Sequence, residues 1–472
     1  MKTKFYSVLF SLLFLLVHSF FAQNTFSYFP APIGEQTLNS NDAEHPCITE
    51  SQYEILQKRC AENRKMLNFP VAGTNKMETA VTLLDWPLKP SPDLHDCSYY
   101  RISAYVDQNT AAAATQDFNC GTNTYDGHRG TDIATWPYNF IKMDSDWVEV
   151  IAAAPGTILD VHDGEFDKNC TSNSMTANYV MIQHADGSTA LYWHMKKNSV
   201  TTKIVGQTVV TGEHLGMVGS SGSSSGPHLH FEVWSAGTVA TRVDPYYGTC
   251  NLLNGSTWWN AQKPHKETGV VKVSVNTTDI VVPPCPATEI PNESSVYQIP
   301  FQGAGLPPGY AKFYIFIRDE VNSLTGDLKI LNPDNSTYLS WAYNSTADRG
   351  SLMWGWSKIL PTNPGTYTFQ GTYNGVTCST TFDIVTPTIN PGFEISGLKV
   401  YPNPSKGKVM IESKLVPGRE IEIFNLTGQI VYRTKLENPL TEIELAVKPG
   451  IYFYRVADKG ILVDAGKLLV EY

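Results

Sequence analysis

Three short segments of the chain place histidines and a carboxylate at spacings that suit metal chemistry. In the first segment, Gly127-His128-Arg129-Gly130-Thr131-Asp132, an imidazole and a carboxylate lie four residues apart between glycines. Both groups are ligands for divalent transition metals, so this pair can converge on one cation. The same spacing also fits a plain surface loop with a capping aspartate, so the other segments must decide between the two.

The second segment, Gly226-Pro227-His228-Leu229-His230-Phe231-Glu232-Val233, is predicted to be a strand that follows a Gly/Ser-rich loop. Alternate side chains of a strand share one face, so His228 and His230 should point the same way, about 6.6 Å apart along the strand. The apolar residues that alternate with them would face the core. Two histidines on one face of an otherwise apolar strand are costly as mere packing, which favours a functional pair.

The third segment is Tyr192-Trp193-His194-Met195, on a strand predicted to follow a hairpin turn at 185–188. A single histidine on a strand is usually structural. A functional role for His194 is indicated only when it is considered together with the other two segments. The Gly/Ser-rich loop at 219–226 lacks the Gly-Lys-Ser/Thr ending of a phosphate-binding loop. We therefore expect a flexible turn there, or a close approach of a substrate backbone.

Taken in chain order, the three segments resemble the lysostaphin/LytM-type zinc metallopeptidases over about residues 120–245. The resemblance extends to Ala152-Ala153-Ala154-Pro155-Gly156-Thr157-Ile158, to His184-Ala185-Asp186-Gly187 and to Val218-Gly219-Ser220-Ser221-Gly222. It implies a small, mostly antiparallel β domain with an open groove over a metal ion.

The resemblance assigns a role to each of five residues. His128, Asp132 and His230 match the ligands of one Zn²⁺, and His194 and His228 match the two catalytic histidines beside it. Three protein ligands leave the fourth position for a water whose pKa falls toward ~7. The chain has no His-Glu-x-x-His motif, so a histidine must accept the proton of that water or hydrogen-bond the oxyanion. Which of the two histidines does which stays open.

Other acidic and imidazole groups have less specific surroundings. Glu232 shares the face of His230 and could orient that ligand, although a surface glutamate would fit the pattern equally well. The remaining histidines have no other potential metal ligands at a suitable spacing in the sequence. We expect them to be structural or solvated: His45, His95, His162, His184, His214 and His265.

Residues 23–80 form a lead-in to this domain. Thr49-Glu50-Ser51-Gln52 matches a capping box, and apolar residues follow it at helical spacing, which predicts one helix with irregular chain around it. The segment could be a propeptide or a strap on the next domain. An Asn, His or Asp from residues 23–100 could fill the open metal position and hold the enzyme latent, with His45 and His95 as candidates.

Length and composition bound the remaining possibilities. A chain of 472 residues suggests about three domains. Hydrophobic residues at 42% and charged residues at 17% exclude global disorder. The 35 Lys and Arg residues against 45 Asp and Glu residues, without a basic run, exclude a nucleic-acid partner on electrostatic grounds.

The N-terminus has the pattern of a secretory signal peptide over residues 1–22. Lys2 and Lys4 precede an apolar run at 8–17, and Ala22 is the expected last residue before cleavage. The alternative is a membrane anchor, and after signal removal no stretch reaches the ~18 apolar residues of a transmembrane span.

Eight cysteines, an even number, fit export to an oxidising compartment. Cys285 and Cys378 are expected to pair with each other because they stand alone in their part of the chain. A bond between Cys47 and Cys60 would be awkward if Cys60 lies three turns along a helix. Without a Cys-x-x-Cys pair, a thiolate zinc site is not expected.

The fold class is mainly β, with three parts along the chain. Residues 81–250 are predicted to be the small antiparallel β peptidase domain, 251–286 a linker, 287–386 an Ig-like β-sandwich and 396–472 a C-terminal β-sandwich.

The last part also resembles a known family. Tyr401-Pro402-Asn403-Pro404, Asn425-Leu426-Thr427-Gly428 and Pro449-Gly450-Ile451-Tyr452 resemble the C-terminal sorting domain of type IX secretion. This implies the secretion machinery as a partner and export through the periplasm to the outer-membrane surface or the medium. A plain stalk or binding module is the alternative.

Three functions follow from these patterns. The first is a secreted zinc metalloendopeptidase acting on peptidoglycan peptides or cross-bridges. The second is a general extracellular endoprotease that cuts Gly-rich protein segments. The third is a non-catalytic cell-wall binding or amidase-activating module, which is disfavoured because such members lose ligands that this chain keeps. Nothing in the Ig-like part names a ligand.

Overall fold

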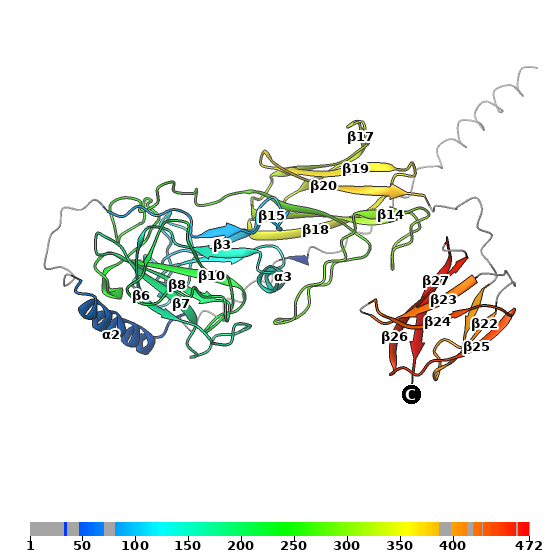
Figure 1. Cartoon of the computed structure of the whole chain (residues 1–472). Coiled ribbons are helices and arrows are strands. Elements are labelled where there is room, and N and C mark those ends of the chain that lie inside the picture. Colours follow the sequence, from blue (N-terminus) through cyan, green and yellow to red (C-terminus); the bar gives the residue numbers. More distant parts are fainter. Residues whose placement is uncertain are drawn as a thin grey trace, which may run out of the picture. The chain divides into compact units, whose positions relative to one another are not determined.

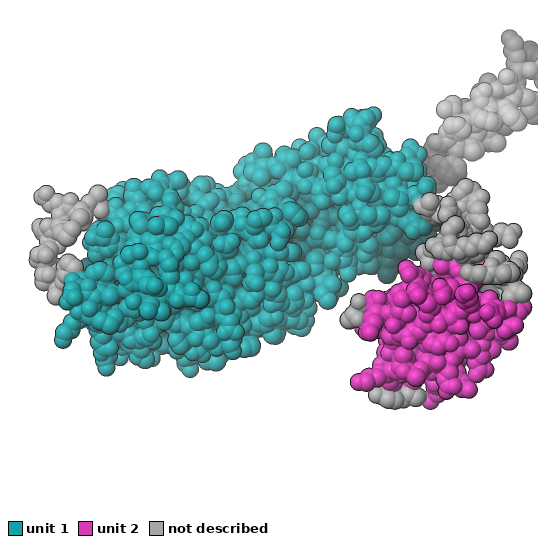
Figure 2. All heavy atoms as spheres, viewed as in Figure 1, with its two compact units in different colours: residues 1–386 teal, residues 387–472 magenta. Residues whose placement is uncertain are grey.

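The computed structural model describes residues 47–69, 81–386, 398–412, 419–426, 428–458 and 461–471, and the backbone of Ile33–Gly34. The predicted signal peptide and His45 therefore lie outside the described residues. The chain divides into two compact units, residues 1–386 and 387–472, shown in Figure 2. Both units consist mainly of antiparallel strands, so the predicted fold class is confirmed. Within the described part, no helix is long and apolar enough to cross a membrane.

The centre of the first unit is one large sheet with the strand order β3-β4-β11-β8-β7-β6-β9, with β12 paired to β11. Its strands are β3 Tyr100–Ala104, β4 Thr131–Thr135, β6 Gly156–His162, β7 Asn178–Gln183, β8 Thr189–Met195, β9 Thr208–Val209, β11 His228–Trp234 and β12 Arg242–Val243. The expected hairpin at 185–188 joins β7 to β8. A small sheet, β10-β5-β2, packs beside it, with β2 Leu88–Pro90, β5 Val148–Ile151 and β10 His214–Met217.

One long helix covers the large sheet, as the capping box predicts. Helix α2 spans Glu50–Met66, and the Thr49 and Gln52 side chains bond reciprocally to each other's backbone amides. Tyr53, Leu56 and Cys60 are buried in a cluster with residues of β6, β7, β8 and β11. Figure 1 shows α2 beside β6, β7 and β8. Two shorter helical turns are α3 Asn139–Asp144 and η2 Val239–Thr241.

The rest of the first unit is a β-sandwich of two sheets, β1-β18-β15-β13 and β14-β20-β19-β16-β17. Its strands are β1 Ile33–Gly34, β13 Gly269–Asn276, β14 Val296–Gln298, β15 Tyr310–Glu320, β16 Thr325–Leu331, β17 Thr337–Asn344, β18 Arg349–Ile359, β19 Gly365–Tyr373 and β20 Val376–Val385. Apolar side chains of both sheets form one core between them.

Residues 251–286, expected to be a linker, contribute to the cores on both sides. Trp258 and Trp259 are buried in the core of the large sheet, and β13 pairs with β15 along its whole length. The segment therefore supplies the last residues of the peptidase core and strand β13 of the sandwich that follows it in the chain. The segment is rich in polar and turn residues, so its composition does not indicate the two buried tryptophans or the eight-residue strand β13.

The predicted bond between Cys285 and Cys378 is wrong. Cys378 pairs with Cys97 and Cys285 with Cys170, while Cys120 pairs with Cys250. Two of these bonds join residues before 251 to the sandwich, contacts that sequence distance cannot reveal. Cys47 and Cys60 carry free thiols, as the helix between them requires.

The second unit also has two facing sheets, β21-β22-β25 and β24-β23-β26-β27. Its strands are β21 Lys399–Tyr401, β22 Lys408–Glu412, β23 Arg419–Phe424, β24 Ile430–Lys435, β25 Leu440–Glu444, β26 Gly450–Asp458 and β27 Ile461–Val470. Buried apolar residues of both sheets form its own core.

The bond between Cys97 and Cys378 offers a test of this architecture. It closes a loop of 281 residues between the peptidase part and the sandwich. Replacing both cysteines by Ala should lower the free energy of unfolding by about 2–4 kcal/mol, because the unfolded chain gains freedom. Thermal unfolding followed by circular dichroism measures this change. Cys60→Ala, which removes an unbonded thiol, is the control, and an unchanged melting temperature in the double variant would contradict the assignment.

Candidate metal centre and catalytic histidines

Strand register brings three of the predicted site residues together. In the β4–β11 pair, Asp132 lies directly opposite His230, and His128 precedes β4 by three residues. The His230 Nδ1 atom is 2.8 Å from Asp132 Oδ1 and 3.2 Å from His128 Nε2. The third edge, from His128 Nε2 to Asp132 Oδ1, is 3.2 Å.

This triangle of donor atoms has the dimensions of a metal site. Ligands about 2.0–2.2 Å from a tetrahedral Zn²⁺ lie about 3.3–3.5 Å from one another. The observed edges of 2.8–3.2 Å are slightly shorter and close to that spacing. The two imidazoles and one carboxylate are also the donor set of a catalytic zinc site. The residues present therefore fit the metal that the resemblance implies.

The outer ring atoms of both ligand histidines fix which nitrogen faces the centre. His128 Nδ1 lies 2.7 Å from the carbonyl oxygen of Tyr105, which can only accept, so Nδ1 carries the proton and donates. His230 Nε2 lies 2.8 Å from Glu232 Oε1, so Nε2 donates to that carboxylate. Each ring thus presents a lone pair to the centre, which a metal ligand needs.

Glu232 is not a surface glutamate. Its side chain is fully buried, and besides His230 it accepts hydrogen bonds from Trp234 Nε1 at 2.8 Å and from the hydroxyl of Tyr53. Burial would raise the pKa of this carboxyl, but the bond and charge of His230 outweigh it and lower the pKa. Of the two readings of Glu232, the structure supports the one in which it orients His230.

His194 and His228 face each other beside the triangle. Their ring centroids are 4.4 Å apart, and His228 Nε2 is 3.7 Å from Asp132 Oδ1. His194 Nδ1 donates to the carbonyl of Ser221 at 2.6 Å, and His228 Nδ1 donates to the carbonyl of Gly226 at 2.8 Å. In both rings Nε2 is therefore the atom that can exchange a proton.

The backbone at His194 is held in an unusual conformation. Its φ of 71° lies in the left-handed region, which costs a non-glycine residue about 1–3 kcal/mol. The neighbouring Met195 carbonyl accepts bonds from Ser221 Oγ at 2.8 Å and Asn178 Nδ2 at 3.0 Å, which hold this bend. The strain turns the imidazole toward His228 instead of into the sheet.

Neighbouring charges and burial shift the pKa values of the site residues. Burial would raise the pKa of Asp132, but the three neighbouring histidines His128, His228 and His230 lower it well below its usual value. Burial and the charge of His228 lower the pKa of His194. His194 therefore stays neutral, as a proton acceptor must.

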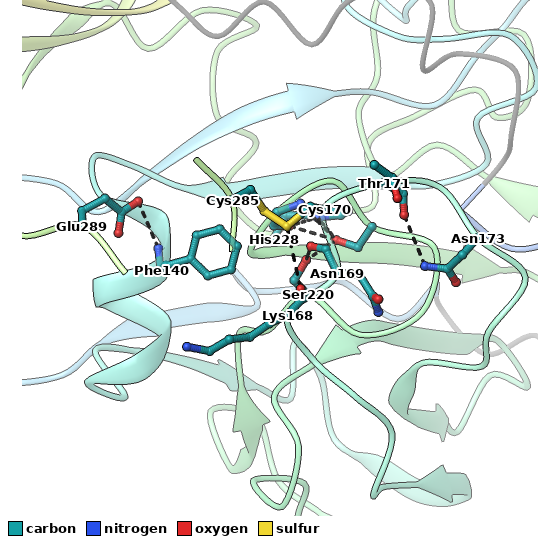
Figure 3. Close-up of a disulfide and its surroundings, with 12 residues drawn as sticks. Phe140, Lys168, Asn169, Cys170, Thr171, Asn173, Ser220, His228, Cys285 and Glu289 are labelled. Carbon is teal, nitrogen blue, oxygen red and sulfur yellow. Dashed lines mark hydrogen bonds between the residues drawn. A yellow bond between two sulfur atoms is a disulfide. The ribbon is translucent and has the colours of Figure 1, made fainter. Parts of the chain in front are cut away.

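The Gly/Ser-rich loop supports the histidines. A Cβ atom on Gly219 would lie 2.4 Å from the backbone nitrogen of Lys196, so only glycine permits this approach. Ser220 and Ser224 are buried, and their hydroxyl oxygens lie 2.8 Å apart. Figure 3 shows the Cys170–Cys285 disulfide with Asn169, Ser220 and His228 around it. Ser220 Oγ donates to the Asn169 carbonyl at 2.7 Å, which ties the disulfide-linked loop to this wall of the site.

One residue at the centre was not predicted. The Cys47 Sγ atom lies with the ligand atoms of His128, Asp132 and His230, all within 4.8 Å of one another, and forms a second such group with His194 and His228. It also lies 2.9 Å from the hydroxyl of Tyr125. The sequence analysis did not single out this thiol, and the structure places it among the candidate ligand atoms.

Of the two histidines offered as candidate ligands from residues 23–100, only His95 lies in the described part of the chain, and it is in neither group of ligand atoms. His95 is exposed to solvent, and His45 lies outside the described residues. A signal for Cys47 did exist, since it stands two residues before the helix cap and cannot reach Cys60. The Cys-x-x-Cys criterion cannot detect such a position, because it looks for two nearby thiols and not for one thiol beside histidines.

Comparisons with known proteins find similar sequences for two parts of the chain. Residues 126–245 match the sequence model of Peptidase family M23, and residues 399–471 match that of the secretion system C-terminal sorting domain. Both resemblances stated from the sequence, to the peptidases and to the secretion sorting domain, are thus confirmed over these residues.

Two relatives and one solved structure illustrate the match. Cell division protein DipM of Caulobacter vibrioides is 31% identical over 25% of this chain and 19% of its own length. Peptidoglycan DD-endopeptidase ShyC of Vibrio cholerae is 30% identical over 24% of this chain and 21% of its own length. The chain thus spans about a fifth of these curated relatives. The catalytic domain of lysostaphin from Staphylococcus simulans is 24% identical, covers 30% of this chain and 89% of that one, and has a TM-score of 0.19.

The contact between Glu232 and His230 yields a second prediction. Glu232→Gln keeps the size of the side chain but removes the charge that orients the ring, so the affinity for Zn²⁺ should fall about 10–100-fold. Competition with a fluorescent chelator measures the affinity. Glu165→Gln is the matched control, because Glu165 pairs with His162 at 2.7 Å near the surface. Equal affinities in both variants would show that Glu232 does not tune the site.

Proposed function

We propose that the chain is a secreted zinc metalloendopeptidase that hydrolyses peptide bonds in peptidoglycan peptides or cross-bridges. The observation that carries the proposal is the convergence of His128 Nε2, Asp132 Oδ1 and His230 Nδ1 on one point, with two further histidines beside it. The name of the Vibrio cholerae relative, a peptidoglycan DD-endopeptidase, supports the substrate class.

His128, Asp132 and His230 would hold the metal. When bound there, Zn²⁺ supplies a Lewis acid that acidifies a water and polarises the scissile carbonyl. Glu232 and the Tyr105 carbonyl keep both ligand rings in the required orientation. These outer contacts precede substrate binding, so the site is preorganised.

His194 and His228 would move the proton and stabilise the developing charge. Each holds its Nδ1 proton against a backbone carbonyl, so the Nε2 atom is the one that exchanges protons with water and leaving group. Burial and the neighbouring His228 lower the pKa of His194, so its ring stays neutral and is available to accept the proton. A protonated His228, next to the Asp132 carboxylate, would then suit the oxyanion.

The other parts of the chain support export. We assign residues 1–22 to a signal peptide, 23–80 to a lead-in, 81–250 to the peptidase domain, 287–386 to an Ig-like sandwich and 396–472 to the sorting domain. Residues 251–286 add Trp258 and Trp259 to the peptidase core and strand β13 to the sandwich. A sorting domain for a secretion system favours a location outside the outer membrane. That location supports a second candidate substrate, Gly-rich segments of extracellular proteins.

The third prediction tests the activity. In a Cys47→Ala background, which removes the thiol from the site, purified peptidoglycan and a Gly-rich protein are incubated separately and the products identified by mass spectrometry. We expect metal-dependent release of muropeptides. His194→Ala and His228→Ala should each lower kcat about 10²–10⁴-fold while zinc content is retained. His230→Ala should lose the metal as well.

His214→Ala is the control, because His214 is half-exposed and pairs with Glu149 away from the centre. Cleavage of the protein substrate alone would move the assignment to a general extracellular endoprotease. Zinc bound with no cleavage of either substrate in the Cys47→Ala background would overturn the catalytic proposal in favour of a binding module.

A further inference from the structure

We propose that Cys47 supplies the fourth ligand of the zinc site and that the N-terminal arm, defined here as residues 47–69, keeps the folded enzyme latent. The inference rests on the proposed function, because it concerns the regulation of the same site. It names a ligand that neither the family match at 126–245 nor the sorting-domain match includes.

The position of the thiol is the first argument. Its Sγ atom and the ligand atoms of His128, Asp132 and His230 all lie within 4.8 Å of one another. The same limit holds for Sγ with the ligand atoms of His194 and His228. A thiolate is a strong Zn²⁺ ligand, and with the two histidines and Asp132 it would complete a tetrahedral site. A closed four-ligand set of this kind has no position left for water or a substrate carbonyl.

The state of His194 is an independent second argument. Its side chain is fully buried, and in the described part of the chain its Nε2 atom has no hydrogen-bond partner. A buried acceptor without a partner is costly and calls for an explanation. His194 forms a group with His228 and the Cys47 thiol, and its Nδ1 is already bonded to the Ser221 carbonyl. We infer that the thiol lies where a water or substrate would contact Nε2 in an open enzyme.

The arm is built to keep the thiol there. Helix α2 buries three side chains in the same core as β6, β7, β8 and β11. Arg59 pairs with the buried Asp160 at 2.7 Å, and Arg64 donates to Gln183 at 2.7 Å and to Thr189 at 2.8 Å. A ligand anchored in this way has a high effective concentration at the metal.

The first turn of the arm also bridges the two sides of the site. Glu50 pairs with Arg129, next to the ligand His128, and Gln52 Nε2 donates to the Met175 carbonyl at 3.0 Å. The Arg129 guanidinium stacks on the ring of Tyr53, 4.6 Å from its centre. Tyr53 in turn bonds to Glu232, so the arm contacts both the open face of the metal centre and the outer side of His230.

The chain offers a matched control. Cys60 is the other free cysteine of the same arm, but its Sγ atom packs 3.5 Å from Met181 Sδ in the apolar core. Removing either thiol deletes one sulfur from the arm. Only the loss of Cys47 should alter the metal centre.

The first test is spectroscopic. Protein expressed from residue 23 onward is loaded with Co²⁺, which takes the place of Zn²⁺ and is visible by absorption. Wild type and Cys60→Ala should show a thiolate-to-cobalt charge-transfer band in the near ultraviolet, and Cys47→Ala should lack it at equal metal content. A wild-type protein without the band would overturn the proposal.

The second test is kinetic. Since only molecules with an open fourth position can turn over, Cys47→Ala should hydrolyse peptidoglycan ~10²-fold faster than wild type, and Cys60→Ala should match wild type. Arg59→Ala with Arg64→Ala, which weakens the anchor and leaves the thiol, should be partly activated. Equal rates for wild type and Cys47→Ala would overturn latency. If no variant cleaves anything, the proposed function fails, while the cobalt band still decides whether Cys47 is a ligand.

Discussion

The register of two neighbouring strands is the constraint on which the site depends. Because β4 and β11 pair so that Asp132 opposes His230, one carboxylate and one imidazole face the same point. His128 needs only the short turn before β4 to join them. A shift of one residue would send every side chain of β11 to the other face of the sheet. The buried Leu229, Phe231 and Val233 make that shift costly, so the apolar core enforces the metal geometry.

Orientation is set from outside the centre. Each of the four histidines bonds through its outer nitrogen to an acceptor without a proton: three backbone carbonyls and the buried Glu232. This arrangement determines every tautomer without any contribution from the metal. Gly130 lies directly under the ring of His230, where a Cβ atom would come within 2.8 Å of it. The polar network and the close backbone contacts thus restrict the orientation of the rings.

Much of this could be predicted from the sequence because it is local. A strand period predicts that His228 and His230 share a face, and a capping box predicts the start of α2. What failed depends on contacts between distant segments. The partners of Cys285 and Cys378 lie 115 and 281 residues away, and nothing near either cysteine marks them. The burial of Glu232 was open for the same reason, since Tyr53 reaches it across 179 residues.

The two free thiols follow from helix geometry. Ten residues of α2 separate Glu50 from Cys60, a rise of about 15 Å, whereas a disulfide needs Cα atoms closer than about 7 Å. An even number of cysteines therefore does not imply full pairing here, and export as proposed would expose both remaining thiols to oxidation. Cys60 is protected by its apolar core. Cys47 lies only partly buried at the end of the arm, and coordination by a metal is the protection that its position offers.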